Sequence, residues 1–293
     1  MVNSPKINNK NLEKQKAAYE QLSAETRAIL LGLVLGDGSL RIALGYINAR
    51  MSFCHSKLQE EYIMWKRKKL APELSAGQDI WLQRAEDVKG YSKNDRWRYQ
   101  SGARASLTYL YKLTHKGTVG QEATIDSKPV EIRRTWLNLM TELSIAVWWC
   151  DDGSIMSGAQ GVFCTDGFQE DQVYILDQYM KKVWGITTSV QRQNKKRKNG
   201  EWRCRLHLAT HEDLRKLLLL IMPHIPTRGM LYKVMLLYAE PELQQRWISE
   251  IVSRTKFPRE EAEKVCMERK ERLAKFKEMG VPEAEESASG DDH

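Results

Sequence analysis

The spacing of hydrophobic and polar residues changes several times along the chain, and each change predicts a boundary between elements. Residues 25–35 form an almost continuous apolar run, typical of a buried helix, that ends at the turn signal Gly36-Asp37-Gly38. Apolar and polar residues then alternate over residues 39–53, which predicts two strands. The elements expected next are a helix over 57–70, strands over 80–84 and 97–101, and a helix over 104–115.

The same order of elements returns in the second half of the chain. Its expected members are a helix over 130–149, a strand pair over 154–165, a helix over 169–184, a hairpin of 187–193 and 202–208, and a helix over 211–222. The Asp-Gly pairs that follow the two apolar helices, at Asp37 and Asp152, lie 115 residues apart. We therefore expect an α+β fold of two pseudo-symmetric αββαββα halves.

This pattern divides the chain into four segments. Residues 1–24 are polar and predict an arm or a frayed helix. Residues 25–128 and 129–238 are the two halves. Residues 239–293 predict a charged helical extension that ends in an acidic, disordered tail.

Charge and composition narrow the class of partner. The 293 residues carry a net charge of +8, divided into +12 for residues 1–238 and −4 for residues 239–293. A basic body favours a polyanion such as nucleic acid, although a merely soluble basic protein would look the same. The chain shows no apolar run long enough for a membrane span and no signal segment, and its five cysteines form no Cys-x-x-Cys pair. These features favour an intracellular protein with reduced thiols and argue against a disulfide framework or a zinc ribbon.

The Asp-Gly pairs are the strongest candidate chemistry. Asp37 and Asp152 each stand at the C-terminal end of an apolar helix, where the helix dipole makes a carboxylate unfavourable unless a cation offsets it. If the two helices pack side by side, both carboxylates converge and can hold divalent metal beside a phosphate. The alternative is that each Asp-Gly simply ends a helix. Gly32 and Gly36, four residues apart, would allow such close packing of the helices.

The residues around these pairs spell a known motif. Leu30–Gly38 reads LLGLVLGDG and Ile145–Gly153 reads IAVWWCDDG, and both resemble the motif of the LAGLIDADG homing endonucleases in their single-chain, two-motif form. The resemblance implies motif helices at the interface between the halves and two antiparallel sheets that form a DNA saddle. It also implies that Asp37 and Asp152 are the metal-binding catalytic acids and that the backbone carbonyls at Gly36 and Asp151 lie near the metals.

The second motif copy departs from the first, because Val147 and Asp151 stand where the first copy has Gly32 and Gly36. Ala146 and Cys150 are the small residues expected to serve the contact instead. The resemblance also implies one basic residue in each half near the scissile phosphate. Lys233 and Lys128 match these positions, with Lys116 as a competitor in the first half and a solvated surface lysine as the alternative reading.

Outward residues of the predicted strands are candidates for DNA recognition. Arg and Gln side chains suit guanine and adenine edges in a major groove, and a lysine-rich hairpin tip suits phosphates. For any single position an ordinary solvated sheet face is the alternative. Trp81, Trp97 and Trp202 are expected to pack rather than to stack on bases. The candidates are Arg41, Arg50, Ser52, Gln83, Arg98, Gln100, Gln191, Gln193, Lys195, Lys196, Arg197, Lys198, Arg203, Arg205 and His207.

These residues and the resemblance together predict a monomeric, site-specific, intron-encoded DNA endonuclease. It would use Mg²⁺, with Ca²⁺ or Mn²⁺ as substitutes, to cut both strands of a long asymmetric target across the minor groove, leaving short 3′ overhangs. Its expected compartment is the cytoplasm of a bacterium or the matrix of a chloroplast or mitochondrion. An RNA-binding intron maturase on the same fold is the main alternative. A DNA-binding regulator without catalysis would be expected to lack the acid pair.

Overall fold

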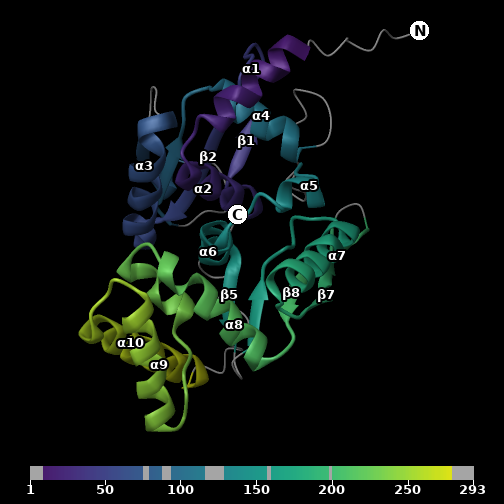
Figure 1. Ribbon diagram of the computed structural model, residues 1–293. Coiled ribbons are helices and arrows are strands. Elements are labelled where there is room, and N and C mark those ends of the chain that lie inside the picture. Colours follow the sequence, from purple (N-terminus) through teal and green to yellow (C-terminus); the bar gives the residue numbers. More distant parts are fainter. Residues whose placement is uncertain are drawn as a thin grey trace.

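The computed structural model describes residues 9–74, 79–87, 94–115, 129–156, 160–197 and 200–278. At its centre two helices from distant parts of the chain pack against each other, α2 (Ala24–Leu35) and α6 (Glu142–Asp152) (Figure 1). Ser23 caps α2 by accepting a hydrogen bond from the Thr26 N–H, and Thr141 and Ser144 form a capping box at the start of α6. Both helices are buried along most of their length, which explains their nearly continuous apolar sequences.

Each central helix leads into a four-stranded antiparallel sheet. The sheet of the first half has the strand order β1-β2-β4-β3, and the sheet of the second half has the matching order β5-β6-β8-β7. The predicted α+β fold of two αββαββα halves is therefore confirmed. The elements of the first half after α2 are β1 (Ser39–Arg41), β2 (Arg50–Ser56), η1 (Lys57–Gln59), α3 (Glu60–Leu74), β3 (Ile80–Gln83), η2 (Ala85–Asp87), β4 (Arg96–Gln100) and α4 (Ala105–Thr114).

The second half repeats this order in the lower part of Figure 1. A short helix, α5 (Arg134–Leu137), precedes it, and two 3₁₀ segments, η5 (Met222–His224) and η6 (Arg228–Val234), follow it. The elements after α6 are β5 (Gly153–Met156), β6 (Gln160–Phe163), α7 (Glu170–Tyr179), the π-helical turn η4 (Met180–Trp184), β7 (Thr188–Lys196), β8 (Trp202–Leu208) and α8 (His211–Ile221).

Two glycines set how closely the central helices approach. A Cβ atom built at Gly32 would lie 2.6 Å from the Ser144 carbonyl oxygen and 2.7 Å from Val147 Cβ. A Cβ at Gly36 would lie 2.6 Å from Asp151 Cβ. The glycines of the first copy therefore make room for the larger residues at the same motif positions of the second copy. The atoms nearest to these two glycines belong to Ser144, Val147 and Asp151, rather than to Ala146 and Cys150, which were expected there.

The N-terminal segment also differs from its prediction. Residues from Asn9 to Glu20 form an ordered helix, α1, rather than an arm or a frayed end. Tyr19 is buried against Tyr109, and Lys112 Nζ donates to Gln15 Oε1 at 2.8 Å. The packing of α1 was not predicted because only one side of the helix is covered, so most of its residues are polar.

Residues 130–149 do not form one helix. Backbone hydrogen bonds from Leu139 and Met140 close a turn between α5 and α6, so the chain changes direction before the capping box. The C-terminal extension is helical as predicted and consists of α9 (Pro241–Arg254) and α10 (Arg259–Glu278), at the lower left of Figure 1. Among the described segments, no helix is long and apolar enough to cross a membrane.

Candidate active site between the two motif helices

The two motif ends meet where α2 and α6 end. Helix α2 stops at Leu35, where the Gly36 N–H still bonds the Gly32 carbonyl, and Asp37 follows directly. Helix α6 includes Asp152 and is closed by the Gly153 N–H. The Asp37 N–H donates to Asp151 Oδ2 at 3.2 Å, so residues 114 positions apart share a hydrogen bond. Both Asp37 and Asp152 therefore lie at the same end of the helix pair, as the sequence predicts.

Asp151 is held by a buried network from the first half. Its side chain and that of Lys66 are both 0% exposed, and Lys66 Nζ lies 2.6 Å from Asp151 Oδ1. The Tyr62 hydroxyl donates to the same oxygen at 2.8 Å. Lys66 also lies over the Tyr62 ring, 4.1 Å from its centroid. Asp151 thus uses its carboxylate within the protein, and its backbone carbonyl is what remains for a metal.

The network continues from Lys66 to Asp37 through a histidine. Lys66 Nζ donates to His55 Nε2 at 2.8 Å, so the Nε2 atom is the acceptor and the proton of a neutral ring is on Nδ1. His55 Nδ1 lies 3.1 Å from Gln59 Oε1 and 3.6 Å from Asp37 Oδ2. One chain of polar contacts therefore joins the acids of both motif copies.

Burial and charge set the protonation states in this network. Burial, reinforced by the Lys66 charge, lowers the pKa of His55 to about 4, which makes the ring neutral at pH 7. Burial alone would raise the pKa of Asp151, but the Lys66 charge and the hydrogen bonds from Lys66 and Tyr62 bring it below the usual value. Burial and the Asp151 charge raise the pKa of Tyr62 well above its ordinary value.

The sequence reasoning missed Lys66, His55 and Tyr62, although each carries a signal. The buried positions of α3 are residues 62, 63, 66, 70 and 74, so Lys66 is a charge on an otherwise apolar helical stripe. In β2 the buried positions alternate through Met51, Phe53 and His55, which places a histidine where an apolar residue is expected. These residues could have been found by searching for titratable side chains at positions that face the core.

Lys233 lies at the predicted place beside the second motif. Its Nζ atom donates to the Gly153 carbonyl at 2.7 Å, directly after Asp152. The Trp149 indole N–H donates to the Lys233 carbonyl at 2.7 Å, which fixes η6 against α6. Lys128 and Lys116, the candidates in the first half, lie outside the described residues.

The donor set suits a hard divalent cation. Asp37, Asp151 and Asp152 bring three carboxylates to one end of the helix pair, whereas Lys66 and Lys233 bring two ammonium groups. Within the part of the chain that the structure describes, Asp37, His55 and Asp151 form a group with ligand atoms within 4.8 Å of one another. Because His55 Nδ1 carries the proton and Asp151 is bonded to Lys66, the oxygen atoms of Asp37, Asp152 and the backbone carbonyls are the ligands that fit.

The outer face of the first sheet, opposite its buried side chains, carries the predicted polar residues. In β2, Arg50 and Ser52 alternate with buried Met51 and Phe53. The register places Arg41 opposite Arg50, Gln100 opposite Ser52, Arg98 opposite Cys54 and Gln83 opposite Arg96. Trp81 lies opposite Arg98 on this same face, whereas Trp97 packs against the core as predicted. Arg96 is thus a further outer-face residue that the sequence reasoning left out, and Trp81, which was expected to pack, lies on the outer face as well.

The second sheet shows the same alternation, with an ion pair between Arg205 and Asp166. Arg203, Arg205 and His207 alternate with buried Cys204, Leu206 and Leu208, and Gln191 lies opposite Arg205. Arg205 donates to both carboxylate oxygens of Asp166, at 3.1 and 2.8 Å to Oδ2 and 3.2 Å to Oδ1. Asp166 therefore orients Arg205 on the outer face.

The hairpin tip only partly matches its prediction. Lys195 is exposed and Gln193 is half-buried, and Lys196 lies over the Trp202 ring at 4.4 Å. Arg197 was expected to bind phosphate, but its side chain is 2% exposed and its guanidinium donates to the Asp166 and Phe168 carbonyls. Arg197 thus closes the tip onto the protein instead of pointing to solvent. Lys198 lies outside the described residues.

Comparison with known proteins agrees with this geometry. The model of the LAGLIDADG DNA endonuclease family matches residues 27–212, and the chain belongs to this family. Among solved structures, the homing endonuclease I-WcaI bound to its DNA recognition sequence is similar, with a TM-score of 0.58 and 17% sequence identity over 81% of this chain and 97% of that chain. No curated protein matches the sequence.

Proposed function

We propose that the protein is a site-specific DNA endonuclease that cuts both strands of a duplex with Mg²⁺, or with Mn²⁺ in its place. The observation that carries this proposal is the contact between the two motif ends, where the Asp37 N–H bonds the Asp151 carboxylate next to Asp152. Membership of a DNA endonuclease family and a basic body support the same activity. Since one chain holds both motif copies, the proposed active form is a monomer.

Each residue of the site has a separate proposed role. A divalent cation supplies charge for the scissile phosphate and lowers the pKa of a bound water. Asp37 and Asp152 would bind it, one from each half, with the carbonyls of Gly36 and Asp151 beside them. Lys233, directed by the Gly153 carbonyl, adds positive charge near the phosphate as negative charge develops on it.

The buried network of Lys66, His55 and Asp151 adjusts the charge and position of the metal-binding residues and does not itself react. Lys66 neutralises the Asp151 carboxylate, so this third acid adds no net negative charge beside the metal ligands. His55 Nδ1 lies 3.1 Å from Gln59 Oε1 and 3.6 Å from Asp37 Oδ2, so the neutral ring fills the space beside the Asp37 carboxylate. The outer faces of the two sheets are the proposed DNA-binding surface, with Arg50, Arg98, Gln100, Gln191 and Arg203 as the readers of base edges.

The direct test is selection of cleaved sites from a plasmid library that carries a random duplex insert. We expect Mg²⁺-dependent linear products that share one long, asymmetric sequence. Products without a common sequence would contradict site specificity. No cleavage, together with tight binding to structured intron RNA, would instead support the maturase.

A further inference from the structure

Helix α10 packs on η6 and reaches the open edge of the second sheet through one arginine. Strand β5 is an edge strand of that sheet, and an uncovered edge would expose its backbone carbonyls. Buried Arg269 donates to the Ile155 carbonyl at 3.0 Å and to the Tyr232 carbonyl at 2.7 Å. One guanidinium therefore fixes α10 to β5 and η6 at once.

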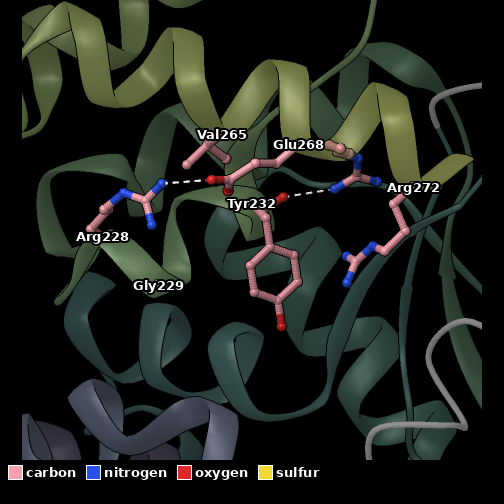
Figure 2. A pocket seen from close by; sticks show the side chains of 7 residues that line it. Arg228, Gly229, Tyr232, Val265, Glu268 and Arg272 are labelled. Atoms are coloured by element: carbon pink, nitrogen blue, oxygen red, sulfur yellow. Dashed lines mark hydrogen bonds and ion pairs between the residues drawn. The ribbon is translucent and has the colours of Figure 1, made fainter.

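A pocket of about 200 Å³ opens beside this anchor (Figure 2). Arg228 on its rim is paired with Glu261 and Glu268, and Arg269 is used by the two carbonyls. Arg272 is exposed, and its guanidinium carbon lies 5.7 Å from the centroid of the Tyr232 ring. The pocket is lined by Arg228, Gly229, Tyr232, Val265, Glu268, Arg269 and Arg272.

The Tyr232 ring connects this pocket to the candidate active site. Lys233 Nζ lies 5.5 Å from the same ring centroid and donates to the Gly153 carbonyl next to Asp152. Arg272 and Lys233 are therefore at most about 11 Å apart. Each DNA strand rises about 3.4 Å per nucleotide, so this distance spans about three nucleotides.

We propose that α10 is part of the DNA interface and that Arg272 binds a backbone phosphate within about three nucleotides of the cleavage position near Lys233. This inference rests on the proposed function and adds a contact outside residues 27–212, the part matched by the family model. Arginine suits the site because its planar guanidinium binds phosphate with two hydrogen bonds. Arg269 fixes α10 to β5 and η6, so the helix that carries Arg272 is already in position before DNA binds.

The test compares Arg272→Gln with Lys270→Gln in the full chain. The two substitutions remove the same charge from the same helix, but Lys270 is exposed about 200° around the helix axis from Arg272. Glutamine has a high helix propensity, so α10 should remain folded in both variants. The probe is a fluorescein-labelled duplex of random sequence, bound in Ca²⁺ at KCl concentrations between about 50 and 200 mM and followed by anisotropy.

Loss of one phosphate contact should make the slope of log K against log[KCl] shallower by about 0.9 for Arg272→Gln and leave it unchanged for Lys270→Gln. Equal slopes for both variants and the wild type would overturn the proposal, even if the wild type cleaves DNA. A loss confined to Arg272→Gln, with no cleavage of the plasmid library by the wild type, would support the contact and reject the endonuclease. A wild-type protein that does not bind duplex DNA would reject both.

Discussion

At the residue scale, Lys66 of the first half and Asp151 of the second half form a buried ion pair between the halves. Removing charges from water is costly, and such a pair is stable only when its remaining donors and acceptors are also bonded. Here His55 and Tyr62 provide those bonds, and the Asp37 N–H takes the second carboxylate oxygen. The pair thus stabilises one arrangement of the motif ends.

Lys66→Met should lower the free energy of unfolding by about 3–5 kcal/mol, because it leaves the Asp151 carboxylate buried without its cation. Urea denaturation at pH 7 measures this change. Lys57→Met is the matched control, since Lys57 and Asp95 form a solvent-screened surface pair whose loss should leave the free energy of unfolding nearly unchanged. Equal losses in the two variants would show that Lys66 does not stabilise Asp151.

Acid should destabilise the protein through its buried histidines. Burial lowers the pKa of His115, which stacks on Tyr111, to about 4, and His55 shifts in the same direction. Between pH 6.5 and 4 the unfolded chain binds more protons than the folded one, so stability falls as pH decreases through this window. His115→Phe should reduce that loss by up to about 3 kcal/mol, measured by urea denaturation at several pH values. An unchanged pH profile would contradict the burial of a neutral His115.

Individual site residues could be predicted only where a recognisable sequence contains them. Asp37, Asp152 and Lys233 were proposed because each matches a recognisable sequence, and the structure places them at the same end of the helix pair. Lys66 and His55 act through side-chain packing between elements, which local spacing does not reveal. Arg197 looked like a solvated cation in a basic run, but carbonyl groups of a distant turn bind it.

At the scale of elements, the fit of α2 against α6 decides whether the motif ends meet. Glycines in the first copy face Val147 and Asp151 in the second, so the two copies complement each other rather than repeat each other. This asymmetry explains why a divergent second motif still supports a close helix pair.

Gly32→Ala tests that fit. In an open helix the substitution would add about 1 kcal/mol of stability, but here the new Cβ would lie 2.6 Å from the Ser144 carbonyl oxygen. We expect a lower unfolding temperature and weaker DNA cleavage. Gly229→Ala is the control, because its Cβ would meet no atom closer than 3.5 Å. A Gly32→Ala protein as stable as the control would contradict the close approach.

Most helices and strands were predictable because burial of one face sets the spacing of apolar residues along each element. The alternation within the strands and the continuous hydrophobicity of the central helices follow directly from which faces are buried. The ordered α1 and the turn before α6 were not predicted, because a polar helix docked on one side and a helix interruption leave weak signals.

At the scale of the whole molecule, two outer sheet faces and a basic body form one proposed DNA surface, and α10 extends it. The charge split of +12 and −4 places the excess of positive charge on residues 1–238, the N-terminal segment and the two halves. Long-range attraction of DNA to this surface brings the phosphate backbone toward the motif ends, where Asp37 and Asp152 lie.

The central claim is that the acids of both motif copies form one cleaving site. The most direct measurement is cleavage of the selected plasmid target in Mg²⁺ by the wild type and by Asp152→Asn, with DNA binding measured in Ca²⁺. We predict that Asp152→Asn makes no double-strand break and binds the target at least as strongly as the wild type does. Wild-type rates of double-strand cleavage by Asp152→Asn would contradict the account.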